Sequence, residues 1–255
     1  MQAARLPRRD RIAILSALIG VTVLSWTYLI RMATQMDMSA MMPAAMLEIH
    51  AWAAGDFVFM FVMWAVMMVG MMVPTAIPMT LVYAAVARKA AGQGTTLAPA
   101  AVFLSGYIAM WTIFSAGATF AQWVLDQAAL LSPMLVSSSP WLGAGLLIAA
   151  GMYQMTPAKE ACLRHCRSPA HFISEHWRPG WAGAFRMGLE HGVFCLGCCW
   201  ALMGLLFFGG VMNLLWIAAI TLFVLIEKVL PFGARSGRFA GIAMIAGGLA
   251  VLSQI

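Results

Sequence analysis

The feature that most constrains the fold is the stretch 193–212, VFCLGCCWALMGLLFFGGVM, which carries no charge over twenty residues. About twenty apolar residues are what an α-helix needs to cross the hydrocarbon core of a bilayer. The stretch also holds three of the five cysteines of the chain, Cys195, Cys198 and Cys199. Because thiolates are soft metal ligands, it raises two questions together: how the chain sits in a membrane, and whether it binds a metal ion.

Composition supports the membrane interpretation. The chain is 63% hydrophobic and 9% charged, whereas soluble domains are about 45–50% apolar and about 25% charged. We therefore expect residues 1–255 to form a single integral membrane domain, an all-α polytopic bundle of transmembrane helices. Its predicted spans number about seven and lie at 12–30, 57–81, 99–122, 141–156, 193–212, 214–232 and 237–255.

The basic residues predict how these spans are oriented. They cluster before the first span, after the second, in the fourth-to-fifth connection and between the sixth and seventh, and only Arg31 lies on the other side. The positive-inside rule then places the N-terminus in the cytoplasm and the C-terminus outside. We expect the first span to be retained as a membrane anchor and not cleaved as a signal peptide, because Trp26, Tyr28 and Arg31 do not form a small-residue cleavage site. Scattered basic residues on short loops also argue against nucleic-acid binding.

The inner connection, 157–192, is long enough to carry chemistry. It begins with Thr156-Pro157, an N-cap residue followed by proline at the first helical position, which predicts a short helix over 157–167. Ser168-Pro169 should end that helix. On it Cys162, His165 and Cys166 share one face, since they are spaced i, i+3 and i+4.

The fifth span supplies a second set of candidate ligands. At 100° per residue His191, Cys195 and Cys198 fall within one arc, and Cys199 lies beside it. If the membrane core begins near Val193, these thiols lie about 3–8 Å below the inner surface, where the loop helix can fold back onto them. The alternative is that the cysteines are small hydrophobes packed against neighbouring helices. A disulfide is disfavoured on the cytoplasmic side, where thiols stay reduced.

Two ionisable residues end the sixth span, Glu227 and Lys228. Such residues are costly in lipid and usually face the protein interior, where they find partners. Pairing of Glu227 with Arg186 or Lys228 would make it structural. The alternative is that Glu227 accepts a hydrogen bond from His191 and so orients that ring as a metal ligand.

Methionine is concentrated in the first third of the chain, which contributes many of the 22 methionines. In the outer loop, 32–56, the candidate soft ligands are Met36, Met38, Met41, Met42 and His50. Thioethers favour Cu(I), so this loop is a candidate secondary copper site. Met60, Met63, Met67 and Met71 continue along one face of the second span. There the simpler interpretation is core packing, for which methionine is well suited.

Several motifs together resemble a known family. They are WAVMMVGMMVP at 64–74, AGMYQMTPAKEACLRHCRSP at 150–169, GLEHGVFCLGCCWALM at 188–203, Met212-Asn213-Leu214 and Glu227-Lys228. Over about 57–248 the chain resembles the bacterial family of predicted metal-binding integral membrane proteins, whose domain has CLxxC and CxGCCW motifs. The resemblance implies a multi-pass inner-membrane protein with a metal site and no established reaction. Its ligands carry over as Cys162, Cys166, Cys195, Cys198 and Cys199.

Two classes of function follow. The first is a protein that binds a metal ion, with copper favoured over zinc, and acts in handling, transport or delivery to a cuproenzyme or partner membrane protein, alone or as a homo-oligomer. Its ligands would be the five cysteines with His191 and His165. The second is an enzyme, a membrane thiol oxidoreductase using Cys195 and Cys198 as a redox pair. A haem or iron–sulfur subunit is a third alternative, although the sequence has no C-x-x-C-H haem attachment motif. The absence of a nucleotide motif argues against an ATP-driven pump. The predicted inner position of Cys195 and Cys198 argues against an enzyme that makes disulfides for export.

Overall fold

The computed structural model describes residues 6–40, 52–131, 137–230 and 233–254. Its regular structure is helical, apart from an isolated bridge between Leu131 and Ser137. The helices are α1 (Arg8–Ala40), α2 (Ala54–Ala91), α3 (Ala100–Gln127), α4 (Pro140–Gln154), α5 (Pro157–Arg167), α6 (Pro169–His176), α7 (Gly180–Gly204), α8 (Leu206–Gly209), α9 (Leu214–Val229) and α10 (Gly233–Leu252). The all-α prediction is therefore confirmed.

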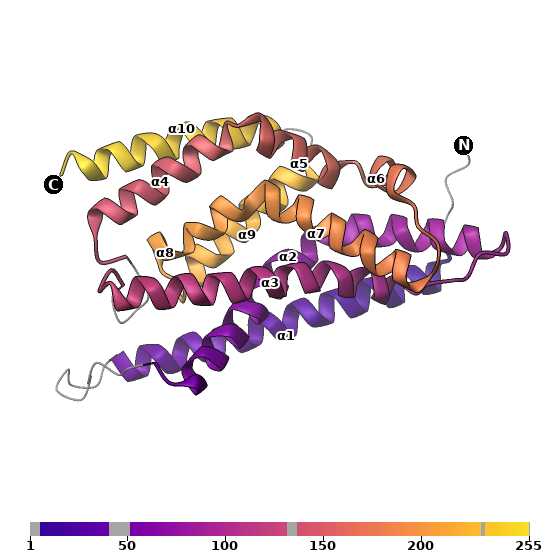
Figure 1. The fold of residues 1–255 in the computed structure, drawn as a ribbon, viewed down its shortest axis with the longest axis horizontal. Helices are drawn as coiled ribbons and strands as arrows, with labels where there is room; N and C mark the ends of the chain where they lie inside the picture. Colours follow the sequence, from indigo (N-terminus) through magenta and orange to yellow (C-terminus); the bar gives the residue numbers. More distant parts are fainter. Residues whose placement is uncertain (1–5, 41–51, 132–136, 231–232, 255) are drawn as a thin grey trace.

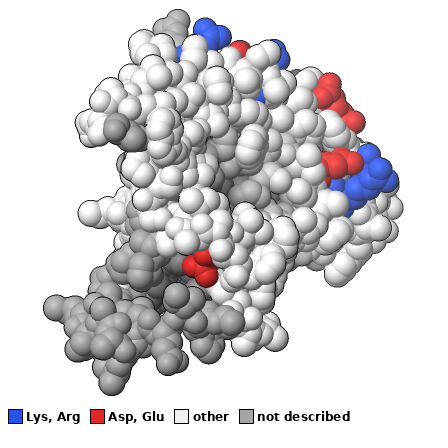
Figure 2. Space-filling model, turned by 60° about the vertical axis from the view of Figure 1, so that its left-hand side comes forward, with Lys and Arg blue, Asp and Glu red and all other residues white. Residues whose placement is uncertain are grey.

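The long helices run side by side along the longest axis of the molecule (Figure 1). Four helical segments are long and apolar enough to cross a membrane: Arg8–Gln35, Ala54–Ala91, Ala100–Gln127 and Gly180–Gly209. Ser236–Leu252 is a shorter apolar helix, so seven spans remain an expectation. The described part of the face shown in Figure 2 is dominated by uncharged side chains, which is compatible with a surface in contact with lipid.

The fifth predicted span differs from the helix that the structure shows. We expected 193–212, but α7 begins at Gly180 and ends at Gly204. Hydropathy marks only the uncharged part of a helix, and the first turns of α7 carry Arg186 and Glu190. At the other end the chain turns at Gly210, whose φ of 97° is a conformation that favours glycine. The inner connection is consequently not a loop but α5, α6 and the start of α7.

The close packing of α3 against α7 has a simple cause. A Cβ on Gly188 would lie 1.8 Å from the carbonyl oxygen of Phe103, and one on Gly106 would lie 2.0 Å from that of Phe185. Only glycine allows two helix backbones to approach so closely. This contact brings Tyr107, next to Gly106, against the cysteine-bearing turn of α7.

Pro74, inside α2, leaves one backbone carbonyl of its helix without the usual N–H partner. Pro74 has no N–H to donate to the carbonyl of Gly70, four residues earlier. The indole nitrogen Nε1 of Trp26, on α1, donates to that oxygen at 3.3 Å instead. A neighbouring helix thus satisfies a backbone group that the proline leaves free.

Candidate metal centre

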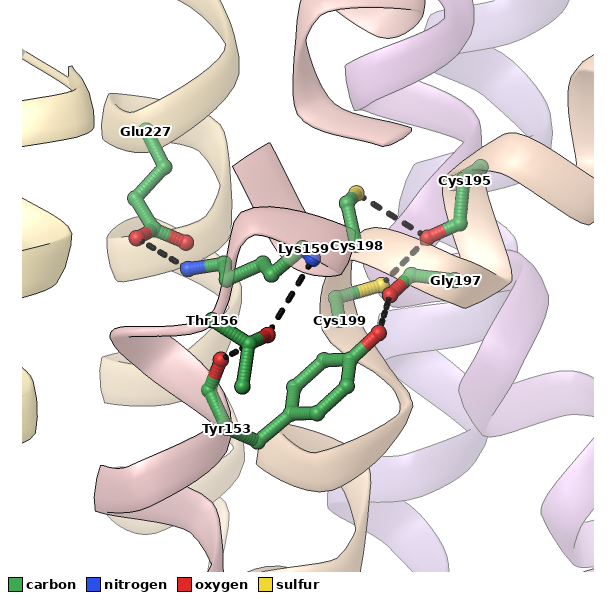
Figure 3. A network of polar contacts seen from close by, with 8 residues as sticks. All are labelled: Tyr153, Thr156, Lys159, Cys195, Gly197, Cys198, Cys199 and Glu227. Carbon is green, nitrogen blue, oxygen red and sulfur yellow. Dashed lines mark hydrogen bonds and ion pairs between the residues drawn. The ribbon is translucent and has the colours of Figure 1, made fainter. Parts of the chain in front are cut away.

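Three thiols lie on one buried turn of α7. Cys195, Cys198 and Cys199 are each no more than 2% exposed. The Sγ atoms of Cys198 and Cys199 donate to the carbonyl oxygen of Cys195 at 3.0 and 2.9 Å (Figure 3). We expected Cys199 to lie beside the set, but its sulfur shares an acceptor with that of Cys198. The sulfurs of Cys198 and Cys199 thus meet at one backbone oxygen of the turn that also carries Cys195. These three thiols, with Cys162 and Cys166 of α5, form the thiol cluster.

The other two thiols come from α5, which has the bounds predicted for it. Thr156 caps the helix, since its hydroxyl accepts from the backbone N–H of Lys159 at 3.3 Å, and Pro157 is its first residue. The helix packs against α7 at Gly197, where a Cβ would lie 2.7 Å from the Sγ of Cys162. The Tyr153 hydroxyl donates to the Gly197 carbonyl (Figure 3). The first contact packs α5 on the cysteine-bearing turn of α7, and the second holds the end of α4, just before α5, against the same turn.

Cys166 interacts directly with the thiols of α7. Hydrogen bonding to Cys195 and Cys198, together with burial, raises the pKa of the Cys166 thiol well above its usual value. Burial, and then the proximity of Cys198, raises the pKa of Cys162. The structure therefore brings together the two sequence-distant cysteine pairs. Both α5 thiols are held in the neutral form, so binding a metal through them must release a proton.

Cys195 is the centre of this cluster. Its Sγ accepts from the ammonium Nζ of Lys228, on α9, at 2.8 Å, and lies 3.0 Å from the Tyr107 hydroxyl. Lys228 is only 7% exposed, and its Nζ also donates to the hydroxyl of Thr75 at 3.3 Å. A buried ammonium needs a negative partner. The described neighbour that supplies it is the Cys195 sulfur, which is thereby stabilised as a thiolate.

Sequence reasoning missed Lys228 and Tyr107 as members of the cluster. It also assigned the wrong partners to Glu227, whose carboxylate pairs with Lys159 (Figure 3). Both side chains of that pair are almost fully buried, at 3% and 2% exposure. Arg186 is 67% exposed and lies near Glu190 instead. Glu227 and Lys228 are adjacent in sequence, but they diverge around α9 and serve two different ion pairs.

The two candidate histidines, His191 and His165, each stack on an aromatic side chain. His191 is buried, stacks on Tyr107 with ring centroids 5.4 Å apart, and has an Nδ1 without a hydrogen-bond partner. His165 stacks on Phe194 at 4.1 Å, and its Nδ1 contacts the Ala161 carbonyl of its own helix. Within the described part of the chain, no hydrogen bond joins either ring to a thiol. Their role as ligands stays a prediction.

The described residues contain no group of three or more His, Cys, Asp or Glu side chains arranged to hold a metal ion. The hydrogen bonds explain this: Cys198 and Cys199 direct their sulfurs to a backbone oxygen, and Cys195 directs its sulfur to Lys228. Rotation about χ1 of Cys198 or Cys199 would be needed to turn sulfur toward a shared ion. The donor set itself, thiols in an apolar setting, suits a soft cation.

The outer methionine set lies largely beyond what can be described. Met41, Met42 and His50 fall outside the described residues, and Met36 and Met38 belong to the last turns of α1. In α2, by contrast, Met63, Met67 and Met71 are fully buried and form part of the same core as the α7 thiols. That position agrees with the packing interpretation of the stripe.

Comparison with known proteins decides the family. The PpoB2 family model, described as a copper chaperone, matches residues 61–251. The chain belongs to this copper chaperone family. Neither the comparison with curated proteins nor that with solved structures gives a match. The family agrees with the expected metal-binding character and with copper as the favoured metal. Its matched region contains the entire thiol cluster and begins after the methionine-rich outer loop.

Proposed function

We propose that this chain is an integral membrane copper chaperone that binds Cu(I) at the thiol cluster and delivers it to a cuproenzyme or a partner membrane protein. Cys195, Cys198 and Cys166 are the primary ligands, Cys199 is a further buried thiol beside them, and Cys162 is the accessible thiol through which copper is exchanged. The observation that carries the proposal is the packing of α5 on the cysteine-bearing turn of α7, with the Cys162 sulfur at Gly197 and Cys166 beside Cys195 and Cys198, in a chain of a copper chaperone family.

The charges at the site favour a monovalent ion with two thiolates. Cu(I) with two thiolates carries a net charge of −1, and the adjacent Lys228 ammonium carries +1. An unbalanced charge is costly in a low-dielectric interior. The second pair, Lys159 with Glu227, is neutral by itself. The buried site therefore becomes neutral when two of the three primary ligands bind Cu(I) as thiolates and the third remains a neutral thiol.

The graded burial of the thiols fits delivery as well as binding. Cys195, Cys198 and Cys199 are buried, whereas Cys162 and Cys166 are partly exposed on α5. Copper can thus pass between buried and accessible sulfurs by stepwise exchange of ligands, without ever being free. A chaperone requires both properties: retention of the ion and a thiol that a partner can reach.

The site should respond to copper in a simple titration. Purified protein in detergent, kept reduced and titrated with Cu(I) against a competing chromophoric chelator, should bind one Cu(I) tightly and bind Zn²⁺ far more weakly. Copper affinity should rise with pH, because the raised pKa of the Cys166 thiol makes its proton a competitor. Absence of tight Cu(I) binding by folded protein would overturn the proposal.

Lys228 provides a test of the charge argument. Replacing Lys228 by methionine should weaken Cu(I) binding by about 10–100-fold, the effect typical of residues that support metal ligands. Lys228→Arg should retain much of the affinity, because it keeps the positive charge. Lys89→Met, at an exposed lysine at the end of α2, is the control and should bind as the parent does. Unchanged affinity in a folded Lys228→Met protein would refute charge compensation.

The proposed location is the bacterial inner membrane, with seven spans and the N-terminus in the cytoplasm. The basic residues support this orientation, which puts α5 and α6 at the cytoplasmic face. Membrane-impermeant thiol reagents added to intact cells should then leave Cys162 and Cys166 unmodified, and should label them after the cells are opened. Rapid labelling of Cys162 and Cys166 in intact cells would contradict this orientation and place α5 outside.

A further inference from the structure

A column of buried thioethers in α2 has no role in the function proposed above. Met63, Met67 and Met71 are each 0% exposed. They are spaced four residues apart, so they lie on one face of the helix and rise about 6 Å per step. Met60 extends the column by one turn toward the start of α2. Packing alone does not require sulfur here, because leucine fills cores equally well and with better-defined rotamers.

The inner end of the column reaches the thiol cluster. The Tyr107 hydroxyl lies 3.1 Å from the carbonyl oxygen of Met72 and 3.0 Å from the Sγ of Cys195. Thr75, one turn after Met71, accepts from Lys228, which itself contacts Cys195. The methionines of α2 and the cysteines of α7 also belong to one continuous buried core. Thr75, one turn after Met71, thus connects the end of the column to the residues around Cys195.

The outer end of the column carries a polar contact. Met60 is partly exposed, and its Sδ accepts from the amide Nε2 of Gln122 at 3.3 Å. The Oε1 of the same amide accepts from the indole of Trp64 at 2.7 Å. Gln122, itself held by Trp64, thus fixes the position of the Met60 sulfur at the outer end of the column. In the proposed orientation this end of the column faces the outside of the cell.

We propose that Met60, Met63, Met67 and Met71 form a Cu(I) relay between the outer end of α2 and the thiol cluster at Cys195. The inference rests on the function proposed above and adds a route and a direction to it. Thioethers are neutral, soft ligands that bind Cu(I), whereas the Cys195 thiolate is negatively charged and attracts it more strongly. Copper remains Cu(I) at every step, since each transfer only exchanges one sulfur ligand for the next. No electron acceptor is needed.

The test compares loading from the two faces of the membrane. Right-side-out vesicles containing the protein are supplied with Cu(I), the reaction is stopped with an impermeant chelator, and copper retained on the purified protein is measured over time. The variant Met63→Leu/Met67→Leu/Met71→Leu should load at least about 10-fold more slowly than the parent. In inside-out vesicles, and at equilibrium in detergent, it should bind as much copper as the parent.

Met79→Leu/Met187→Leu is the matched control, because these methionines are equally buried but belong to a separate core cluster. It should load at the parental rate from both faces. Loading of the triple variant at the parental rate from outside would overturn the relay while leaving the copper site intact. If the triple variant fails to fold, the single Met67→Leu variant gives the same comparison, and parental loading there has the same meaning. Failure of the parent protein to bind copper in detergent would instead overturn the proposed function.

Discussion

Replacing Cys195 by serine is expected to remove nearly all copper from the protein. Its sulfur is the one that Lys228 and Tyr107 contact, and Cys166 and Cys198 hydrogen-bond to the same residue. A serine hydroxyl is a hard, neutral donor at physiological pH and a poor substitute for a soft thiolate. The loss in Cu(I) affinity should exceed the roughly 10–100-fold typical of supporting residues. Chelator competition and copper content measure it.

The other cysteines give a graded series. Cys166→Ser and Cys198→Ser should lose most of the copper as well, since a ligand set acts cooperatively. Ala201→Ser is the control, because it adds a hydroxyl at another buried position of α7 without touching a thiol. If only Cys195 and Cys198 matter while the α5 thiols are dispensable, the cluster is a redox pair and not a shared site. Parental copper content in both Cys162→Ser and Cys195→Ser would refute a shared site altogether.

Replacing Glu227 by glutamine should cost about 3–5 kcal/mol of folding free energy, the range observed when one partner of a buried ion pair is removed. The change leaves the Lys159 ammonium buried without a counter-charge. Gly237 packs closely on this pair, since a Cβ at that position would lie only 2.5 Å from the Glu227 carboxylate oxygen. Little space is therefore left for water to enter and solvate the ammonium. Thermal or denaturant unfolding in detergent measures the loss.

Removing both partners should recover much of that stability. In Lys159→Met/Glu227→Met no buried charge remains, and apolar replacements of ion pairs are often neutral or stabilising. Copper binding per folded molecule should be unchanged in both variants, because the pair does not contact the sulfurs. Loss of copper from a Glu227→Gln protein of unchanged stability would place Glu227 in the metal site and contradict the structural role.

The features that could be predicted from the sequence are those specified by residues close together in the chain. The helix over 157–167 was predicted at its observed bounds because Thr156, Pro157 and Ser168-Pro169 specify its ends within the chain itself. The same logic placed Cys162 and Cys166 on one face. The approach of α5 to α7 was also foreseeable, since both cysteine pairs were expected at the same membrane depth.

The features that sequence missed depend on packing between helices. Nothing local tells whether Lys228 turns toward Glu227 or Cys195, because adjacent residues on a helix differ by 100° in direction. The role of Tyr107 depends on the contact between Gly106 and Gly188, which only the assembled pair of helices reveals. The start of α7 at Gly180 was missed because charged residues in its first turns hide a continuous helix from a hydropathy pattern.

The central claim is that one Cu(I) is held by thiolates that α5 and α7 contribute together. X-ray absorption spectroscopy at the copper edge, on protein loaded with one equivalent of Cu(I), tests it most directly. The account predicts monovalent copper with sulfur as its only nearest neighbours, and a spectrum that changes in Cys166→Ser and in Cys195→Ser alike. Copper bound mainly through nitrogen or oxygen, or a spectrum that neither substitution alters, would contradict it.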